Sequence, residues 1–260
     1  MKVAVCISGQ LRNWQISKDN QLWFWTTINR PELQVDYFTH TWTYSQDREG
    51  VSQEYINRDI PEEEYLEFLD FYKPKKHRQD SFKTKYFVSN DHWSSLFYSY
   101  AQSLLMKREY EIENNFTYDI VIKSRPDVAF NPREFCNLPH KLNDGCIYTT
   151  HGGLMPMEFN MVNFNDCVFL GNSYTMDITS NIYYFRQYFV NDKFNHLLNV
   201  HPLGPGTLMH EFFREYGITP YFDLEWTECL VKAGCPEGLD LFVPDQYDEL
   251  NEYFRNWYNK

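Results

Sequence analysis

Tyr118-Asp-Ile-Val-Ile-Lys-Ser-Arg-Pro-Asp-Val-Ala-Phe130 is the stretch of this sequence that decides the fold. It opens with an apolar run, Ile120-Val-Ile122, which is typical of a buried strand. Pro126 cannot donate a hydrogen bond to a sheet ladder, so we expect the strand to end near Ser124. Its carboxyl end would lie where open α/β sheets bind their ligands. Three charged residues alternate along this part of the chain and would share one face of an extended segment: Lys123, Arg125 and Asp127.

The charged residues of this stretch would bring opposite charges together at the end of the strand. A carboxylate beside two fixed cations suits a metal–phosphate site, in which a divalent cation joins Asp127 to a phosphate and Arg125 and Lys123 stand nearby. The alternative interpretation is a surface ion pair between Arg125 and Asp127 that only ends the strand. The short motif by itself does not separate the two.

Length, composition and net charge limit the kinds of protein that this chain can be. Its 260 residues are enough for one large domain, and 20 Tyr, 21 Phe and 7 Trp supply a core and stacking surfaces. The formal charge of −12 argues against nucleic acid as the main partner, because binding to its backbone needs clustered Lys and Arg. An anionic ligand would therefore need a few well-placed cations or a divalent metal.

The cysteines and the N-terminus indicate a reduced protein of the cytoplasm. The six cysteines form no CxxC pair and no zinc-binding spacing. Met1-Lys-Val3 leads directly into an apolar strand without a signal-peptide pattern, and no apolar run approaches the length of a transmembrane segment. We therefore expect a soluble protein in the cytoplasm, or in the host cytoplasm if a virus encodes it.

The first residues predict a strand, a short loop and a helix, in that order. Lys2-Val-Ala-Val-Cys-Ile7 is a continuous apolar run, as expected for a central parallel strand. A polar loop follows, and Asn13 is positioned to cap a helix that runs from Trp14 to about residue 28. In this order, the backbone N–H groups at the start of the helix point towards the space above the strand, where they can bind an anion. The alternative interpretation of the loop is an ordinary tight turn with a solvated Arg. The loop residues that we expect to bind phosphate are Ser8, Gly9, Gln10 and Arg12.

A second strand follows the first helix and completes a βαβ unit. Val35-Asp-Tyr-Phe-Thr-His40 is predicted to lie beside the first strand, so that His40 and Thr41 reach the same sheet edge as the polar loop. We include both residues in the candidate ligand site, although a single His is more often structural than ligand-binding.

Further helices and strands are predicted along the rest of the chain. Helices are expected at about 61–70, from Asp91 or Ser94 to about 114, from Ser173 to about 189, and from Pro205 to Gly217. Strands are expected at 146–150, 167–170 and 218–222. The whole chain, 1–260, would form one α/β domain.

The third predicted helix has an apolar face at helical spacing. We expect its buried residues to be Phe97, Tyr100, Ala101, Leu104 and Leu105. Tyr98, Gln102 and Lys107 are expected to lie off that face.

Four blocks of the sequence together resemble a family of small glycosyltransferases that occur in bacterial surface-polysaccharide gene clusters and in the genomes of large phages and viruses. The blocks are Val3-Ala-Val-Cys-Ile-Ser-Gly-Gln-Leu-Arg12, Asp36-Tyr-Phe-Thr-His-Thr-Trp42, Tyr118-Asp-Ile-Val-Ile-Lys-Ser-Arg-Pro-Asp127 and Asn165-Asp-Cys-Val-Phe-Leu-Gly171. They follow one another over roughly two thirds of the chain, and the resemblance rests on the agreement of all four.

The resemblance implies a GT-A-like fold, a Rossmann-type, mostly parallel sheet flanked by helices that binds a nucleotide sugar. In that family a DxD-type motif holds a divalent metal against the diphosphate, and Arg125-Pro-Asp127 would stand in its place. Arg125 occupies the position of the usual first Asp, which leaves Asp127 as the metal ligand. His201, with His210 as second choice, is the expected second ligand of Mn²⁺ or Mg²⁺.

The resemblance thus predicts sugar transfer from a nucleotide-diphosphate sugar, with a uridine-based donor favoured, to an unidentified glycan or other acceptor. Asp166 precedes a predicted strand and is our candidate for the carboxylate nearest the reacting sugar, acting as a base or stabilising positive charge. The alternative is that Asp166 only closes an Asx-turn with its own backbone.

Two other function classes stay open at this point. A sugar nucleotidyltransferase uses a similar sheet and metal, but it usually carries a Gly-rich loop with Arg and Lys, of which only Gly9 and Arg12 are present. A non-catalytic carbohydrate-binding protein would also suit the many Tyr and Trp. Release of free nucleoside diphosphate, of pyrophosphate, or of neither separates the three classes.

Overall fold

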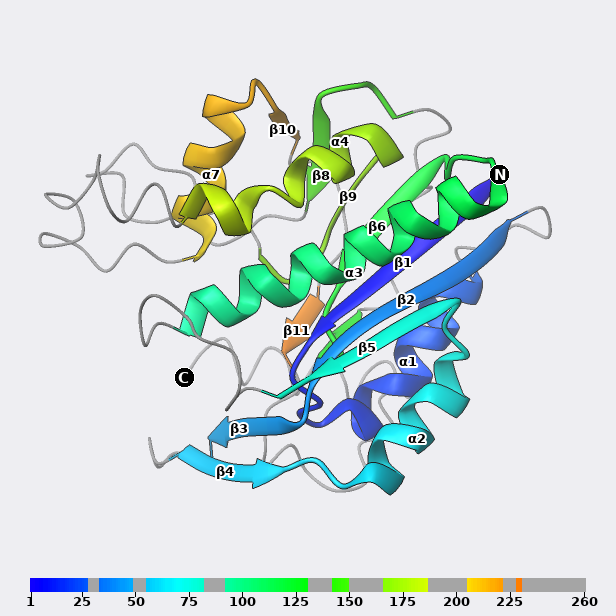
Figure 1. Ribbon diagram of the computed structural model, residues 1–260, viewed down its shortest axis with the longest axis vertical. Coiled ribbons are helices and arrows are strands. Elements are labelled where there is room, and N and C mark those ends of the chain that lie inside the picture. The colour runs from blue at the N-terminus through cyan, green and yellow to red at the C-terminus, as the bar shows by residue number, and fades with distance from the viewer. Residues whose placement is uncertain are drawn as a thin grey trace, which may run out of the picture.

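The computed structural model describes most of the sheet and the helices that cover it (Figure 1). The described residues are 1–27, 33–48, 55–81, 92–130, 142–149, 166–186, 205–221 and 228–230. In these ranges, none of the helices is long and apolar enough to cross a lipid bilayer.

A seven-stranded, mostly parallel sheet forms the centre of the molecule, in the order β10-β8-β9-β6-β1-β2-β5. β9 runs antiparallel to both of its neighbours, β6 and β8, and the other pairs are parallel. The strands are β1 (Lys2–Gly9), β2 (Gln34–Trp42), β5 (Lys76–Asp80), β6 (Ile120–Ser124), β8 (Cys146–Thr149), β9 (Phe169–Gly171) and β10 (Thr219–Tyr221).

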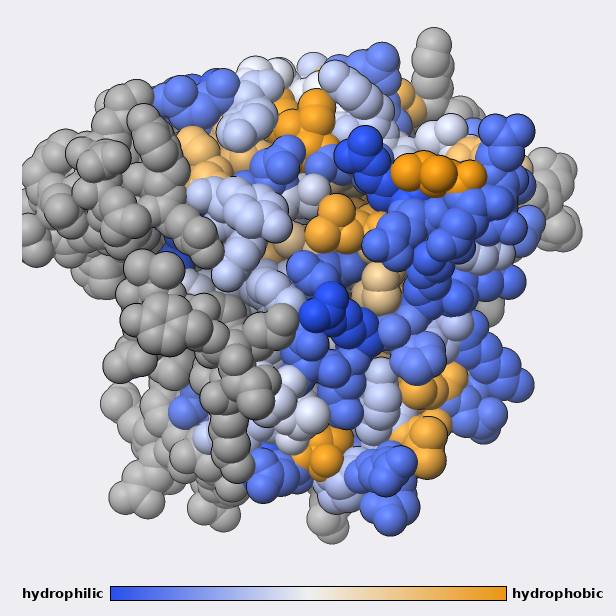
Figure 2. Space-filling view, viewed as in Figure 1, coloured by the Kyte–Doolittle hydropathy of each residue, from blue (hydrophilic) through white to orange (hydrophobic). Residues whose placement is uncertain are grey.

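Helices cover both faces of this sheet, which makes the described fold a three-layer α/β arrangement. Figure 1 looks onto the face covered by α3 (His92–Asn114), α4 (Ser173–Thr179) and α7 (Pro205–Glu215). α1 (Trp14–Thr27) and α2 (Glu62–Tyr72) lie on the far side. The described part of the near surface is mostly hydrophilic (Figure 2).

Two small antiparallel sheets stand beside the main one. β3 (Tyr44–Arg48) continues from β2 and pairs with β4 (Tyr55–Asp59). β7 (Val128–Phe130) comes directly after Asp127 and pairs with β11 (Glu228–Leu230), so a late segment of the chain returns to the charged stretch.

The side chains of β1 alternate between two hydrophobic cores, because successive residues of a strand point to opposite faces of the sheet. Val3, Val5 and Ile7 pack with α1 and α2, whereas Ala4 and Cys6 pack with α3, α4 and α7. All five are at most 2% exposed. A central strand covered on both faces reads as a continuous apolar run, which is why the sequence predicts β1 well.

Most of the predicted elements are confirmed, including the end of β6 at Ser124 and the helix from Pro205. β5 was not predicted, because its sequence, Lys76-His-Arg-Gln-Asp80, is polar throughout and contains no apolar residue. It lies at the sheet edge, where such residues are tolerated. The helix expected from Ser173 to residue 189 differs as well. Asn172 is its cap, accepting the N–H of Thr175, and the helix ends at Thr179 before a second helical segment at 182–186.

Lys107 corrects the prediction for the third helix, because it is fully buried instead of lying off the apolar face. Its Nζ lies 2.8 Å from a carboxylate oxygen of Glu111 and 2.7 Å from one of Asp177 on α4. Tyr98 is buried too, and Leu105 is only partly buried. A larger part of α3 is therefore buried than its apolar stripe indicates, because a charged network joins α3 to α4.

Replacing Lys107 with Met should destabilise the protein by about 3–5 kcal/mol, because the carboxylates of Glu111 and Asp177 would lose their buried cation. Urea denaturation measures the difference in the free energy of unfolding. Arg108→Met is the matched control: Arg108 is 58% exposed and its pairing distance to Asp177 is 4.0 Å, so we expect a change within about 0.5 kcal/mol. Equal losses in the two variants would contradict the assigned role of Lys107.

Candidate functional site

The carboxyl ends of β1, β2 and β6 meet at one edge of the sheet. The parallel register pairs Ile7 with Ser124 and Gly9 with Thr41. Gly9 has a φ of +138°, a conformation that side chains rarely adopt, and a Cβ there would come 3.5 Å from Pro126. The polar loop after β1 therefore turns directly onto the segment that follows β6.

Two arginines hold the carboxylate of Asp127 at this edge. Arg125 donates from Nε to Oδ1 at 2.8 Å and from Nη2 to Oδ2 at 2.8 Å, which is a two-point contact. Arg12 approaches from the loop after β1, with Nε 3.2 Å and Nη2 3.0 Å from Oδ2. The side chain of Asp127 is 4% exposed, that of Arg125 is 12% exposed and that of Arg12 is 30% exposed.

The charges of this cluster support one another. Burial alone would raise the pKa of Asp127, but Arg125 and then Arg12 lower it below its usual value. Burial would likewise lower the pKa of Arg125, and the adjacent Asp127 raises it instead. With all three groups ionised, the cluster of Arg12, Arg125 and Asp127 carries a net charge of about +1 in an acidic protein, which suits an anionic ligand.

Polar side chains of α1 hold the backbone from Arg125 to Phe130. Gln21 Nε2 donates to three carbonyl groups, those of Arg125 at 2.9 Å, Pro126 at 3.0 Å and Val128 at 2.8 Å. Ser17 Oγ donates to the Pro126 carbonyl at 2.5 Å. Asn20 both donates to and accepts from the Phe130 backbone, at 2.9 and 2.7 Å.

These α1 residues were missed by the sequence analysis. Their signal is the spacing of Ser17, Asn20 and Gln21, which puts three polar groups on one face of a helix that is otherwise packed on the core. Buried polar groups of this kind need partners, and here the partners are the backbone groups of the charged segment.

The β3–β4 hairpin borders the same edge. Arg12 Nη1 donates to the Gln46 carbonyl at 3.2 Å, and Gln10 Oε1 accepts the N–H of Gln46 at 2.9 Å. Arg58 on β4 donates to the carbonyl of Leu11 at 3.1 Å and pairs with Glu64 of α2. The loop after β1 is thus fastened from the hairpin side.

Lys123 and Asp166 lie together on the α3 side of this edge. Lys123 Nζ donates to the carbonyl of Asp166 and to that of Cys167, the latter at 3.1 Å. Burial lowers the pKa of Lys123 to about 8, against a smaller opposing effect of the Asp166 charge. The antiparallel pairing of Lys123 with Phe169 carries Asp166 beyond the end of β6, so the structure brings both predicted residues to the site edge.

His40, Ser8 and Thr41 are fully buried. His40 lies in an internal network, with Nδ1 2.8 Å from Ser99 Oγ and Nε2 3.3 Å from Asp80 Oδ2. The hydroxyl groups of Ser8 and Thr41 have no hydrogen-bond partner in the described part of the chain. Roles in ligand binding for these three residues stay predictions, since none of them presents surface to a ligand here.

Asp80 belongs to the same network and was not singled out from the sequence. Burial alone would raise the pKa of Asp80, but hydrogen bonds from Tyr98, His40 and Arg78 lower it to about 2. Asp80 is the last residue of the edge strand β5, which the sequence did not predict.

The residues around Asp127 do not fit a divalent metal in this arrangement. Both carboxylate oxygens already accept hydrogen bonds from guanidinium groups, and a cation at Asp127 would stand between two positive charges. Within the described ranges, no group of three or more His, Cys, Asp or Glu could hold a metal ion. His201 lies outside the described residues, and His210 falls within α7.

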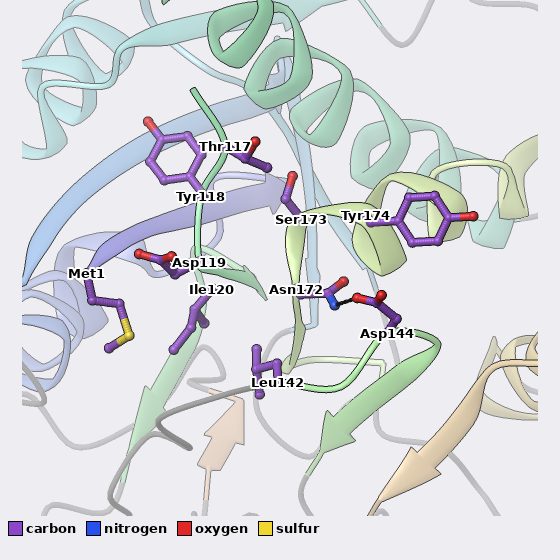
Figure 3. A pocket seen from close by; sticks show the side chains of 10 residues that line it. All are labelled: Met1, Thr117, Tyr118, Asp119, Ile120, Leu142, Asp144, Asn172, Ser173 and Tyr174. Atoms are coloured by element: carbon purple, nitrogen blue, oxygen red, sulfur yellow. Dashed lines mark hydrogen bonds between the residues drawn. The ribbon is translucent and has the colours of Figure 1, made fainter. Parts of the chain in front are cut away.

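A separate cavity of about 320 Å³ opens at the opposite edge of the sheet, by the amino end of β6 (Figure 3). Asp119 and Asp144 are among its lining residues, and Asn172 donates to Asp144 at 2.5 Å. None of the described lysines or arginines lines it. A cavity with this charge does not suit a diphosphate, whereas the edge at Asp127 offers guanidinium groups.

Comparisons with known proteins give weak structural likenesses. No family model and no curated protein matches the chain. A crystal structure of a glycosyltransferase involved in glycosylation of the major capsid of PBCV-1 aligns at 11% identity over 78% of each chain, with a TM-score of 0.34.

Two more solved structures align at similar levels. The apo form of the glycosyltransferase GlyE of Streptococcus pneumoniae TIGR4 aligns at 13% identity over 85% of this chain and 44% of its own, with a TM-score of 0.38. A nucleoside-diphosphate-sugar pyrophosphorylase from Vibrio cholerae RC9 aligns at 10% identity over 96% and 99%, with a TM-score of 0.39. Likeness at this level says nothing about the activity of this chain.

Lys123 should lose its proton near pH 8, well below a solvated lysine, because its burial disfavours the charged form. NMR titration of ¹³C-dimethylated lysines measures this, with Lys123→Met to assign the signal. Since the pKa is lower in the folded state, stability should rise with pH from about 8 towards the unfolded value of about 10.4. A signal that titrates with the exposed lysines would contradict this environment.

Proposed function

We propose that this protein is a glycosyltransferase that takes its sugar from a nucleotide-diphosphate sugar and acts in the cytoplasm. The observation that carries the proposal is the cluster of Arg12, Asp127 and Arg125, with its buried carboxylate, at the carboxyl edge of a mostly parallel sheet. Open α/β sheets bind ligands at this edge. The resemblance of the four sequence blocks favours a uridine-based donor, and the acceptor is a glycan or another hydroxyl compound.

The chemistry of sugar transfer suits these residues. Cleavage of the bond between the anomeric carbon and the diphosphate oxygen leaves additional negative charge on the diphosphate. Guanidinium groups held in advance stabilise that charge without reorganising during the reaction. Arg125 uses Nε and Nη2 for Asp127, and within the described chain its Nη1 has no partner, so N–H donors remain for phosphate oxygens.

Asp166 is the proposed carboxylate nearest the reacting sugar. Its carbonyl is tied to Lys123, so the residue is held at the site edge, and its side chain is partly exposed. A carboxylate there serves as the general base for an acceptor hydroxyl or stabilises positive charge on the sugar. Both roles need the negative charge of the carboxylate, which an Asn side chain of the same shape lacks.

The role of Mn²⁺ or Mg²⁺ at Asp127 and His201 stays a prediction from the family resemblance. No step of the proposed reaction is assigned to a metal, because both oxygens of Asp127 are used by arginines.

A panel of nucleotide sugars, incubated with and without Mn²⁺, tests the function through the release of free nucleoside diphosphate. We expect release from at least one donor, and Arg12→Ala should weaken donor binding by about 1.5–3 kcal/mol, the usual contribution of a charged hydrogen bond. Arg214→Ala, an exposed arginine of α7, is the control. Pyrophosphate as the product would indicate a nucleotidyltransferase instead, and the absence of any product would argue for a carbohydrate-binding protein.

Asp166→Asn should reduce turnover by about 10²-fold or more while donor affinity hardly changes, because acid–base groups contribute about that much. Steady-state kinetics and calorimetry measure the two quantities separately. Asn closes the same Asx-turn as Asp. Turnover within a few-fold of the parent would therefore mean that Asp166 only shapes the backbone.

A further inference from the structure

Both carboxylate oxygens of Asp127 accept hydrogen bonds from the protein itself. Oδ1 accepts from Arg125, and Oδ2 accepts from both Arg125 and Arg12, at distances from 2.8 to 3.2 Å. A carboxylate that ligates Mn²⁺ or Mg²⁺ must offer an oxygen lone pair at about 2 Å to the ion. In this arrangement both oxygens already face guanidinium N–H groups, which is where an ion would have to approach.

Two like charges would also oppose a metal at this position. A divalent cation bound to Asp127 would lie a few ångströms from Arg12 and Arg125, in a setting where the carboxylate is 4% exposed and water screens little. To admit the ion, both arginines would have to leave. For Arg12, the hydrogen bond from its Nη1 to the Gln46 carbonyl at 3.2 Å works against this.

The arginines supply what a metal would otherwise provide. A guanidinium group offers a planar set of N–H donors that matches phosphate oxygens, and it keeps its charge at all relevant pH values. Arg12 is the more exposed of the pair, at 30%, and Arg125 has its Nη1 without a partner in the described chain. Both therefore retain donors that a ligand at the sheet edge can reach.

We propose that Arg12 and Arg125 bind the diphosphate directly, without a divalent metal, and that Asp127 is a positioning residue that orients the two guanidinium groups. The inference rests on the proposed function, since it concerns the same ligand. It departs from the sequence-based expectation, in which Asp127 is a metal ligand. In this arrangement the acidic residue lowers the net charge of the cluster but fixes the geometry of both donors.

Calorimetric binding of UDP and GDP, measured once in EDTA and once with Mn²⁺, tests the proposal. We expect the affinity of the parent protein to differ by less than about tenfold between the two solutions, which is less than 1.4 kcal/mol. Arg12→Lys and Arg125→Lys keep the charge but lose the planar fork, and each should weaken binding in EDTA by about fivefold or more. Arg214→Lys on α7 is the matched control and should bind as the parent does.

Asp127→Asn separates positioning from metal ligation. If Asp127 positions the arginines, the substitution should lower the nucleotide affinity by the same factor in EDTA and in Mn²⁺. The ¹⁵N-detected Nε–H signals of Arg12 and Arg125 should also shift. If Asp127 is a metal ligand, the substitution should lower the nucleotide affinity only in Mn²⁺. Circular dichroism and the midpoint of thermal unfolding show whether each variant is folded.

The other outcomes overturn the proposal in distinguishable ways. If binding strengthens about tenfold or more with Mn²⁺ and Asp127→Asn removes that gain, a metal bridges the diphosphate and only this inference fails. If either Lys variant binds as the parent does in EDTA, the arginines do not hold the ligand. If neither nucleotide binds in either solution and no donor of the panel releases a nucleoside diphosphate, the proposed function fails, and the inference fails with it.

Discussion

The buried carboxylate of Asp127, held between two guanidinium groups, is the interaction on which the site depends. Removing a carboxylate from water is unfavourable unless opposite charges and N–H donors replace the lost hydration. Arg125 comes from the same segment, but Arg12 comes from the loop after β1. The pairing therefore requires β1 and β6 to lie side by side in the observed register.

Helix α1 secures this pairing with a buried polar face. Gln21, Asn20 and Ser17 hold the backbone next to Asp127, and one turn further along Phe24 stacks on Phe130 with ring centroids 4.0 Å apart. Polar contacts fix where the segment lies, and aromatic packing fixes where it ends. A helix with a uniform apolar face would bury more hydrophobic surface but leave those carbonyl groups unpaired.

Two of the places where the fold buries charged groups serve different ends. The network of Lys107, Glu111 and Asp177 joins α3 to α4, with all of its main partners supplied by the protein. The cluster at Asp127 instead leaves N–H donors unused by the described chain, at a sheet edge. Donors that the protein leaves unused beside a fixed charge remain available to an anionic ligand.

The sequence alone determined the central strands and the charged edge. Continuous apolar runs mark β1 and β6 as buried strands, and Gly9 and Pro126 show where the chain leaves them. These signals depend only on neighbouring residues in the chain. Only the tertiary structure decided which groups the polar and charged side chains contact. Lys107 and Gln21 each lie in a helix whose local sequence does not show which groups they will contact, and β5 is polar throughout. Their roles depend on groups far away in the chain. Likewise, a local motif shows that Asp127 is present but not that Arg12, 115 residues earlier, shares its carboxylate.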